Sequence, residues 1–363
     1  MIDIASGGTS IWLDDLSRSK ISGSDSHSLP QRIALCGVVG VTTNPSIFNT
    51  AISKGSEYSA DIASMRGQSP EEIVKKLTTD DVRQACDLFL PMYKDSAGID
   101  GRVSIEVDPR SAHKTLETIS EGLELWKIVN RPNVLIKVPA TLEGLPAITA
   151  LISEGVSVNV TLIFSVERYG QVVDAFMAGL EARLAAGNDI ANVTSVASLF
   201  VSRIDTAIDL LLKEHESSSA KNLLGKAAIA NAVLAYQLYE GKLDSQRWAE
   251  LQSHGARMQR LLWASTGVKD PDYLDTRYVV ELVAPNTVNT MPQATLDALV
   301  DHGSLHLVEL TSRYSEAAET IASLSKIGIS LPVITHDLEV DGVLKFEQAW
   351  NELLANVEKA ASA

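Results

Sequence analysis

A lysine lies at the centre of a very apolar stretch of this chain, NVLIKVPAT at residues 133–141. The stretch predicts a buried β-strand, with Lys137 between Ile136 and Val138. Burial disfavours a charged ammonium, so we expect Lys137 to reach solvent, to form an ion pair or to act as a neutral nucleophile. A neutral amine can attack a ketone and form an imine with it. For a single lysine in a strand, the ion pair or the solvent-exposed amine is the more common outcome.

Polar side chains that could support such chemistry recur in neighbouring apolar segments. Over 102–108 and 156–164, apolar and polar residues alternate, and successive side chains of a strand point to opposite faces. If the apolar faces pack against outer helices, one polar set points inward, namely Lys137, Glu106, Asn159 and Thr161. The same pattern has a simpler interpretation, which is a polar network that is satisfied within the core.

Imine formation requires proton transfer, which a carboxylate with a bound water can provide. Glu106 and Thr161 could hold such a water. The segment IWLDDLS places Asp14 and Asp15 at the end of another predicted strand, and either could take a proton from a substrate hydroxyl as a carbon–carbon bond breaks. Asn44, in GVTTNPSIF, could orient hydroxyl groups without titrating, although an asparagine before a proline is also a common turn residue.

Two further segments carry candidate substrate-binding residues. Ser198, Phe200 and Arg203 occur in SVASLFVSR, and Ser265 occurs in WASTG with Lys269 just beyond it. A phosphate group needs cationic partners, and Arg203 and Lys269 are the candidates. The net charge of −15 makes such local cations necessary, because the overall field repels an anionic substrate.

The apolar segments alternate with longer amphipathic stretches, which is the pattern of parallel strands connected by helices. Eight strands are predicted: 9–15, 36–43, 102–108, 133–139, 156–164, 192–199, 260–265 and 278–284. Helices are predicted between them, for example over 111–130, 166–186 and 203–215. Eight such units favour an α/β protein with a (β/α)8 TIM barrel, in which active sites lie at the carboxyl ends of the strands.

No linker or low-complexity segment divides the chain. We therefore expect one domain over 1–363, with a helical insertion around 218–258 and C-terminal helices from about 311. The strongly negative charge argues against nucleic acid or a membrane surface as a partner. Cys36 and Cys86 provide no disulfide framework and no CxxC motif, and no signal sequence opens the chain, so we expect a cytoplasmic protein.

Six motifs occur in an order that resembles the transaldolase family: GVTTNPSIF, SIEVD, LIKVPAT, NVTLIFS, SLFVSRID and WASTG. TTNPS together with IKVPAT is highly specific, and the resemblance extends from Ile11 to about Phe346. It implies a class I, Schiff-base aldolase-type barrel of the non-oxidative pentose phosphate pathway, which transfers a dihydroxyacetone unit between phosphorylated sugars. The overall length and the stretch 218–258 resemble the larger bacterial branch of the family.

The resemblance also implies a role for each candidate residue. Lys137 forms the Schiff base with the ketose. Asp14 is the acid–base residue of aldol cleavage, with Asp15 as the alternative, and Glu106 and Thr161 hold the catalytic water. The implied substrate-binding residues are Asn44 and Asn159 for the dihydroxyacetone moiety, Ser198 and Phe200 for lining the site, and Arg203 for the phosphate.

The segment after the seventh predicted strand departs from part of the family. Some members carry an arginine phosphate ligand closely after the serine that corresponds to Ser265. Here Lys269 follows instead, and a lysine binds phosphate as a point charge without the bidentate fork of arginine.

Two other functions are compatible with parts of this pattern. A fructose-6-phosphate aldolase would use the same chemistry but release dihydroxyacetone, and the chain length and Phe200 favour the transferase. A catalytically inactive barrel that serves as a binding protein would be expected to lose Lys137, Glu106 or Asp14, and all three are present.

No cofactor and no metal are expected. The glycines form no P-loop or GxGxxG signature. His302 and His306 are four residues apart with Glu309 beyond, a spacing that can bind zinc on a helix, but Gly303 interrupts the helical pattern and no third ligand is evident. We expect a monomer or a homodimer.

Overall fold

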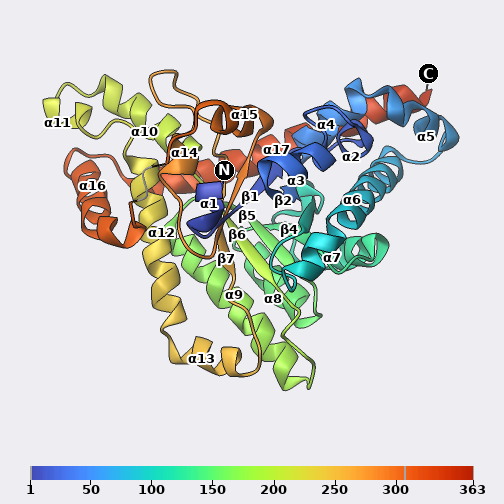
Figure 1. Cartoon of the computed structure of the whole chain (residues 1–363), viewed down its shortest axis with the longest axis horizontal. Helices are drawn as coiled ribbons and strands as arrows, with labels where there is room; N and C mark the ends of the chain where they lie inside the picture. Colours follow the sequence, from blue (N-terminus) through green and yellow to red (C-terminus); the bar gives the residue numbers. More distant parts are fainter. Residues whose placement is uncertain (1, 306–307, 363) are drawn as a thin grey trace.

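Parallel strands form a closed barrel at the centre of the molecule (Figure 1). The structure is a computed structural model, and it describes residues 2–305 and 308–362. In chain order around the barrel, the strands are β1 (Thr9–Asp14), β2 (Val38–Thr42), β3 (Arg102–Glu106), β4 (Val134–Pro139), β5 (Val158–Ile163), β6 (Ser195–Phe200), β7 (Arg260–Ala264) and β8 (Thr287–Met291). Because β1 pairs with both β2 and β8, the ring is closed. The predicted (β/α)8 TIM barrel is confirmed.

The first seven strands overlap their predicted positions, but the predicted strand 278–284 is wrong. Its apolar run YVVELVA lies partly in the one-turn helix α14 (Arg277–Val280), and the eighth strand is the more polar segment TVNTM that follows. A short apolar run does not distinguish a buried strand from a buried helix. Here Tyr278 is buried within α14, and its hydroxyl donates to Asp205 at 2.7 Å.

Helices surround the barrel and include the predicted ones. The helices before β3 are α1 (Ile2–Ser6), α2 (Arg18–Ser22), α3 (Leu29–Cys36), α4 (Pro45–Lys54), α5 (Ser59–Ser64) and α6 (Pro70–Asp95). Those between β3 and β7 are α7 (Thr115–Val129), α8 (Gly144–Ser153), α9 (Val166–Ala185), α10 (Ser202–Glu214), α11 (Ser218–Lys221), α12 (Ala227–Leu243) and α13 (Gln246–Ser253). After β8 follow α15 (Gln293–His302), α16 (Tyr314–Lys326) and α17 (Leu331–Ser362), and short 3-10 helices are η1 (Ser56–Tyr58), η2 (Pro109–Ser111) and η3 (Leu310–Arg313).

Local signals fix where helices begin after the loops. The start of α6 has a complete capping box, in which Ser69 and Glu72 bond to each other's backbone amides, and Pro70 occupies the first turn. The Oγ of Ser165 accepts from the amide of Arg168 at 3.0 Å and starts α9 directly after β5. Such caps set the length of the loops at the carboxyl ends of the strands.

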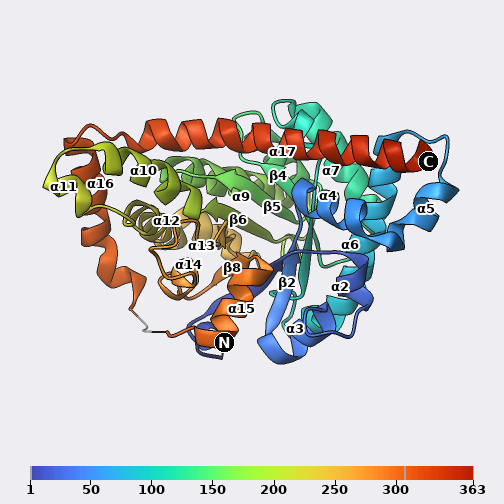
Figure 2. The same ribbon diagram turned by 90° about the horizontal axis from the view of Figure 1, so that it is seen from above.

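The C-terminal helix α17 runs across one end of the barrel (Figure 2). It packs on α4, α6 and α10 and also contacts β5. Gly342 permits this close approach, because a Cβ atom there would lie only 3.0 Å from Cδ2 of Leu162 in β5. Leu353 and Val357 of α17 are fully buried against the neighbouring helices. The helix therefore covers the carboxyl ends of strands, where barrel enzymes hold their active sites.

The barrel strands are buried on both faces. Every residue of β3, β4, β5, β6 and β8 is buried. No single helix in the described part of the chain is long and apolar enough to cross a membrane, whereas residues Leu310–Lys326 and Leu331–Ser362 pass that test only together, across a 91° bend.

Candidate active site

Lys137 lies inside the barrel near the carboxyl end of β4, where two acceptors hold it. Its Nζ donates to Oε2 of Glu106 at 3.1 Å and to the carbonyl oxygen of Thr43 at 2.6 Å. The exposed fraction of the side chain is 6% for Lys137 and 4% for Glu106. The ring centroid of Phe346, from α17, lies 5.9 Å from Nζ. Of the environments that the sequence left open, the structure shows an enclosed ion pair that does not reach solvent.

The register of the barrel places three predicted residues side by side. Glu106, Lys137 and Asn159 are paired at their Cα positions across β3, β4 and β5. The Nδ2 of Asn159 donates to Oγ of Ser104 at 3.0 Å, and its Oδ1 accepts from Oγ of Ser198 at 2.7 Å. These bonds fix the orientation of the amide next to the amine.

Two oxygen atoms of the predicted site are buried without a hydrogen-bond partner among the residues described: Oε1 of Glu106 and Oγ1 of Thr161. Buried polar atoms are nearly always satisfied, so each of these two oxygen atoms is available to a polar ligand. Burial raises the pKa of Glu106, the ammonium of Lys137 lowers it, and the charge of Asp14 raises it further. Burial dominates, so this carboxyl group holds a proton at higher pH than an ordinary glutamate.

An irregularity in β5 lies next to Thr161. Leu162 has a φ of +61°, in the left-handed region that leucine rarely adopts, and the β5–β6 register shifts between Val160 and Ile163. A residue held in this conformation costs about 1–3 kcal/mol, and such features cluster at active sites, where they re-aim side chains. The contact of Leu162 with Gly342 lies at this irregular position.

The two aspartates at the end of β1 lie in different environments. Oδ1 of Asp14 accepts from Oγ1 of Thr42 at 2.6 Å, and that hydroxyl also lies 2.6 Å from Oγ1 of Thr290. Burial raises the pKa of Asp14, and the charge of Lys137 opposes this shift. Asp15 instead forms an ion pair with Lys20 at 3.1 Å, and its side chain is 30% exposed. Of the two aspartates, Asp14 is therefore the one shown to interact with the charge of Lys137.

Asn44 and Ser265 both have structural contacts at the carboxyl end of the barrel. Oδ1 of Asn44 accepts from the amide of Ile47 at 3.0 Å and caps α4. Ser265 has a φ of +53°, and its Oγ lies 3.1 Å from Oγ of Ser202 at the start of α10. Asn44 therefore has the structural role that its position before a proline suggested. Its side-chain amide nitrogen is not used in this cap and can bind another partner.

Arg203 lies at the start of α10 beneath α17. Its guanidinium carbon is 5.5 Å from the ring centroid of Phe200, which in turn lies 5.2 Å from that of Phe164. Nη1 of Arg203 is buried without a hydrogen-bond partner within the described chain, and a Cβ atom on Gly342 would lie 3.7 Å from it. Burial lowers the pKa of Arg203, and the charge of Asp341 on α17 opposes the shift. A half-enclosed guanidinium group with an unused donor is suited to an anion.

The family described as transaldolase/fructose-6-phosphate aldolase matches residues 11–357 of this sequence. The chain belongs to the transaldolase family. The transaldolase of Mycolicibacterium smegmatis is 54% identical over 353 residues, which cover 97% of this chain and 94% of the relative. The transaldolases of Mycobacterium tuberculosis H37Rv and Saccharopolyspora erythraea are each 53% identical, covering 97% and 98% of this chain and 94% and 96% of the relatives. This transaldolase-family protein is thus a transferase on a TIM barrel.

Lys269 lies apart from the residues gathered around Lys137. In this transaldolase-family enzyme it is exposed and lines a separate cavity of about 300 Å³ with Asp270 and Tyr273. The lining of that cavity includes no other residue of the predicted site. Lys213 pairs with Asp270 at its edge, at 2.7 Å.

The histidine spacing singled out in the sequence lies at a surface. His302 contacts Asp275 at 2.9 Å and Asp301 at 3.1 Å through its two ring nitrogens. His306 lies outside the residues that the structure describes.

Several residues at the site were not singled out from the sequence. Thr42 and Thr43 bind Asp14 and Lys137, and their signal was available because both belong to the TTNPS motif. Phe346 and Gly342 come from α17 and lie more than two hundred residues after β4 in the chain. Neither has a local signal, since their positions depend on how α17 docks on the barrel.

Proposed function

We propose that this enzyme transfers a dihydroxyacetone unit from sedoheptulose 7-phosphate to glyceraldehyde 3-phosphate, giving erythrose 4-phosphate and fructose 6-phosphate. The observation that carries this proposal is the buried amine of Lys137, held between Glu106 and the Thr43 carbonyl in a chain of the transaldolase family. A buried amine whose counter-ion can take its proton becomes a nucleophile without contact with bulk water.

The first half-reaction begins when the deprotonated amine of Lys137 attacks the ketose carbonyl carbon. Glu106 accepts the proton of the ammonium and, through a water shared with Thr161, protonates the carbinolamine hydroxyl that leaves as water. The unsatisfied Oε1 of Glu106 and Oγ1 of Thr161 support this assignment. The product of this step is a protonated imine on Lys137.

Cleavage of the next carbon–carbon bond requires a base at the substrate hydroxyl. Asp14 takes that proton, the bond electrons move into the protonated imine, and an aldehyde leaves while an enamine stays on Lys137. The enamine then attacks the acceptor aldehyde, Asp14 returns the proton to the new hydroxyl, and a water molecule hydrolyses the resulting imine to release fructose 6-phosphate and the free amine of Lys137. The raised pKa of Asp14 supports both directions, because a group that acts in turn as base and acid is most effective when its pKa lies closer to the operating pH.

The remaining residues bind the substrate in this proposal. The amides of Asn44 and Asn159 contact the dihydroxyacetone hydroxyls, and Ser198 and Ser265 line the same end of the barrel. Arg203 binds the phosphate through its unused Nη1 donor. We assign Lys269 a weaker role at most in phosphate binding, since it is exposed and lines another cavity.

Aromatic rings support transfer over simple aldol cleavage. Phe346, Phe200 and Phe164 lie at the end of the barrel that α17 covers. An apolar enclosure keeps water from discharging the enamine before the acceptor binds. A fructose-6-phosphate aldolase would release dihydroxyacetone from fructose 6-phosphate without an acceptor. A product assay with and without erythrose 4-phosphate separates the two, and acceptor-independent release at the rate of transfer would contradict the transferase.

Borohydride trapping tests the chemistry directly. Reduction in the presence of fructose 6-phosphate should inactivate the enzyme irreversibly and add a reduced dihydroxyacetone adduct to the peptide that holds Lys137. Labelling of another lysine would overturn the assignment. We further propose a cytoplasmic enzyme that is a monomer or a homodimer and acts on sugar phosphates without nucleic acid or membrane partners, which fits its two free cysteines and its net charge of −15.

A further inference from the structure

A cavity of about 310 Å³ lies at the amino-terminal end of the barrel, opposite the candidate active site. Its walls include residues that precede or begin strands, such as Gly98, Arg102, Ser195 and Arg260, together with residues of α12 and α13. In Figure 1, α12 leads down to α13 at the lower edge of the molecule, whereas α17 lies in the upper half.

Three arginines line this cavity: Arg102, Arg257 and Arg260. The first is only 2% exposed, and its Nε donates to the carbonyl oxygen of Gly98 at 3.0 Å. Arg257 donates to the carbonyl oxygen of Ala97. These two bonds satisfy donors but supply no negative charge.

The positive charge around the cavity is only partly neutralised. Asp100 accepts from Nη1 of Arg260 at 3.1 Å, and it is the one carboxylate that pairs with any of the three arginines in the described part of the chain. Nε of Arg260 is buried without a hydrogen-bond partner among the described residues. No acidic residue occurs among the described residues that line the cavity. The pKa of Arg102 is lowered to about 10, mainly by burial and also by the charges of Arg257 and Arg260, while Tyr93 and Asp100 oppose the shift. A bound anion would relieve this repulsion.

The rest of the wall is apolar and aromatic. Leu243, Trp248 and Tyr239 form the side toward α12 and α13, and Leu135 and Val196 form the side toward the barrel interior. Leu135 lies two residues before Lys137 on β4, which corresponds to about 7 Å along the strand. The cavity thus combines cations with apolar surface, as sites for organic ligands do.

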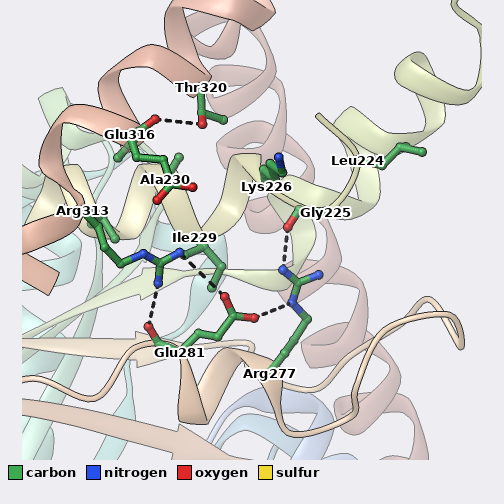
Figure 3. Close-up of a pocket in the computed structure, with 12 residues that line it drawn as sticks. Leu224, Gly225, Lys226, Ile229, Ala230, Arg277, Glu281, Arg313, Glu316 and Thr320 are labelled. Carbon is green, nitrogen blue, oxygen red and sulfur yellow. Dashed lines mark hydrogen bonds and ion pairs between the residues drawn. The ribbon is translucent and has the colours of Figure 1, made fainter. Parts of the chain in front are cut away.

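A second cavity of similar size shows what a neutralised cluster looks like (Figure 3). It lies between α12, α14 and α16, and its two guanidinium groups both face one carboxylate. Nε of Arg277 lies 3.3 Å from Oε1 of Glu281, and Nη2 of Arg313 lies 3.8 Å from Oε2. Glu316 also lines it. Both of these arginines face a carboxylate, whereas of the three at the amino-terminal end of the barrel only Arg260 has a carboxylate partner in the described part of the chain.

We infer that the cavity lined by Arg102, Arg257 and Arg260 is a binding site for a small organic anion, whose phosphate or carboxylate contacts the arginines and whose apolar body packs on Trp248 and Leu243. The site is separate from the candidate active site, since it opens at the other end of the barrel.

Calorimetric titration of the full-length Arg203→Ala protein tests this inference, because that variant removes the proposed phosphate ligand of the active site. The probes are phenyl phosphate, benzoate, inorganic phosphate and phenol. We expect at least one aromatic anion to bind about tenfold or more tightly than both phenol and inorganic phosphate. Preference for phenyl phosphate or for benzoate distinguishes the two kinds of anionic group.

Arg257→Glu in the same background is the decisive variant, because Arg257 is partly exposed and makes one backbone bond. It should weaken binding of the aromatic anion by about tenfold or more, whereas Arg313→Glu, the same charge change at the cavity in Figure 3, should alter it less than about twofold. Circular dichroism and the thermal midpoint establish that each variant is folded. Equal binding by the Arg257→Glu and Arg313→Glu proteins, or no binding of either aromatic anion up to about 10 mM, would overturn the inference.

Discussion

Oε2 of Glu106 lies 3.1 Å from Nζ of Lys137, with 4% and 6% of the two side chains exposed. A shift of one proton from nitrogen to oxygen within this pair converts an ion pair into a neutral amine and a neutral acid. The neutral form is the one that can attack a carbonyl. A structural ion pair and a catalytic pair therefore share this geometry, and experiments on function must separate them.

Glu106→Gln keeps the size of the side chain but removes its ability to accept a proton. Turnover should fall by about 10²-fold or more, with a much smaller change in KM for fructose 6-phosphate. Glu121→Gln is a matched control, because burial raises the pKa of Glu121 to about 7 but its carboxylate accepts from the backbone amide of Asp108 and not from Lys137. Steady-state kinetics and thermal unfolding of both variants measure this. A low thermal midpoint of Glu106→Gln with normal specific activity of its folded fraction would show a purely structural role.

Asp14→Asn should stabilise the protein at neutral pH while abolishing most activity. Burial raises the pKa of Asp14 above its ordinary 3.8 in the folded state. A carboxyl of this kind favours the fold below its unfolded-state pKa, and that stability is lost as pH rises through the folded-state pKa. The wild type therefore carries a cost near pH 7 that asparagine lacks, and the Thr42 hydroxyl can still donate to the amide oxygen.

The measurement is the thermal midpoint of both proteins against pH. The rise in thermal midpoint caused by Asp14→Asn should shrink as the pH falls and vanish below about pH 4, where Asp14 is protonated in both the folded and the unfolded state. A gain that is constant over this range would mean that the charge of Asp14 is not the cause. Asp15→Asn, which loses an ion pair with Lys20, should show no gain.

The inner residues of β3, β4 and β5 could be predicted because alternation along a strand fixes which side chains share a face. Glu106, Lys137 and Asn159 needed only this periodicity and the barrel to be placed together. The eighth strand could not be predicted this way, because TVNTM is polar and a more apolar run precedes it. Barrel closure, a non-local pairing with β1 and β7, decides that strand.

The contacts made by α17 also could not be predicted from the sequence. The position of Phe346 over Lys137 depends on the docking of a helix almost two hundred residues later in the chain. Likewise, the loop after β7 directs Lys269 away from the cluster, and sequence distance from Ser265 did not indicate this direction.

Arg203→Ala should raise KM for phosphorylated substrates by about tenfold or more, which corresponds to at least about 1.4 kcal/mol of charge-assisted binding. The KM for an unphosphorylated acceptor such as glyceraldehyde should change much less, because that acceptor makes no phosphate contact to lose. Lys269→Ala removes an exposed cation outside the cluster and should have a smaller effect. Steady-state kinetics with both acceptors measure the difference, and an unchanged KM in Arg203→Ala excludes it as the phosphate ligand.

Lys137→Arg retains a cation of similar length but cannot form an imine, so it should fold, show no turnover and resist borohydride labelling.

Lys137→Met tests the ion pair by itself, because it removes the ammonium and leaves Glu106 in place. Without the ammonium that lowers it, the pKa of Glu106 should rise further, because burial is then unopposed. A carboxyl with a raised folded-state pKa loses its stabilising effect as pH rises, so the thermal midpoint of Lys137→Met should fall relative to the wild type between about pH 5 and pH 8. The double variant Lys137→Met/Glu106→Gln carries no titrating group at either position and should lose this dependence. Activity in Lys137→Arg would contradict the Schiff base, and an unaltered pH profile in Lys137→Met would contradict the buried pair.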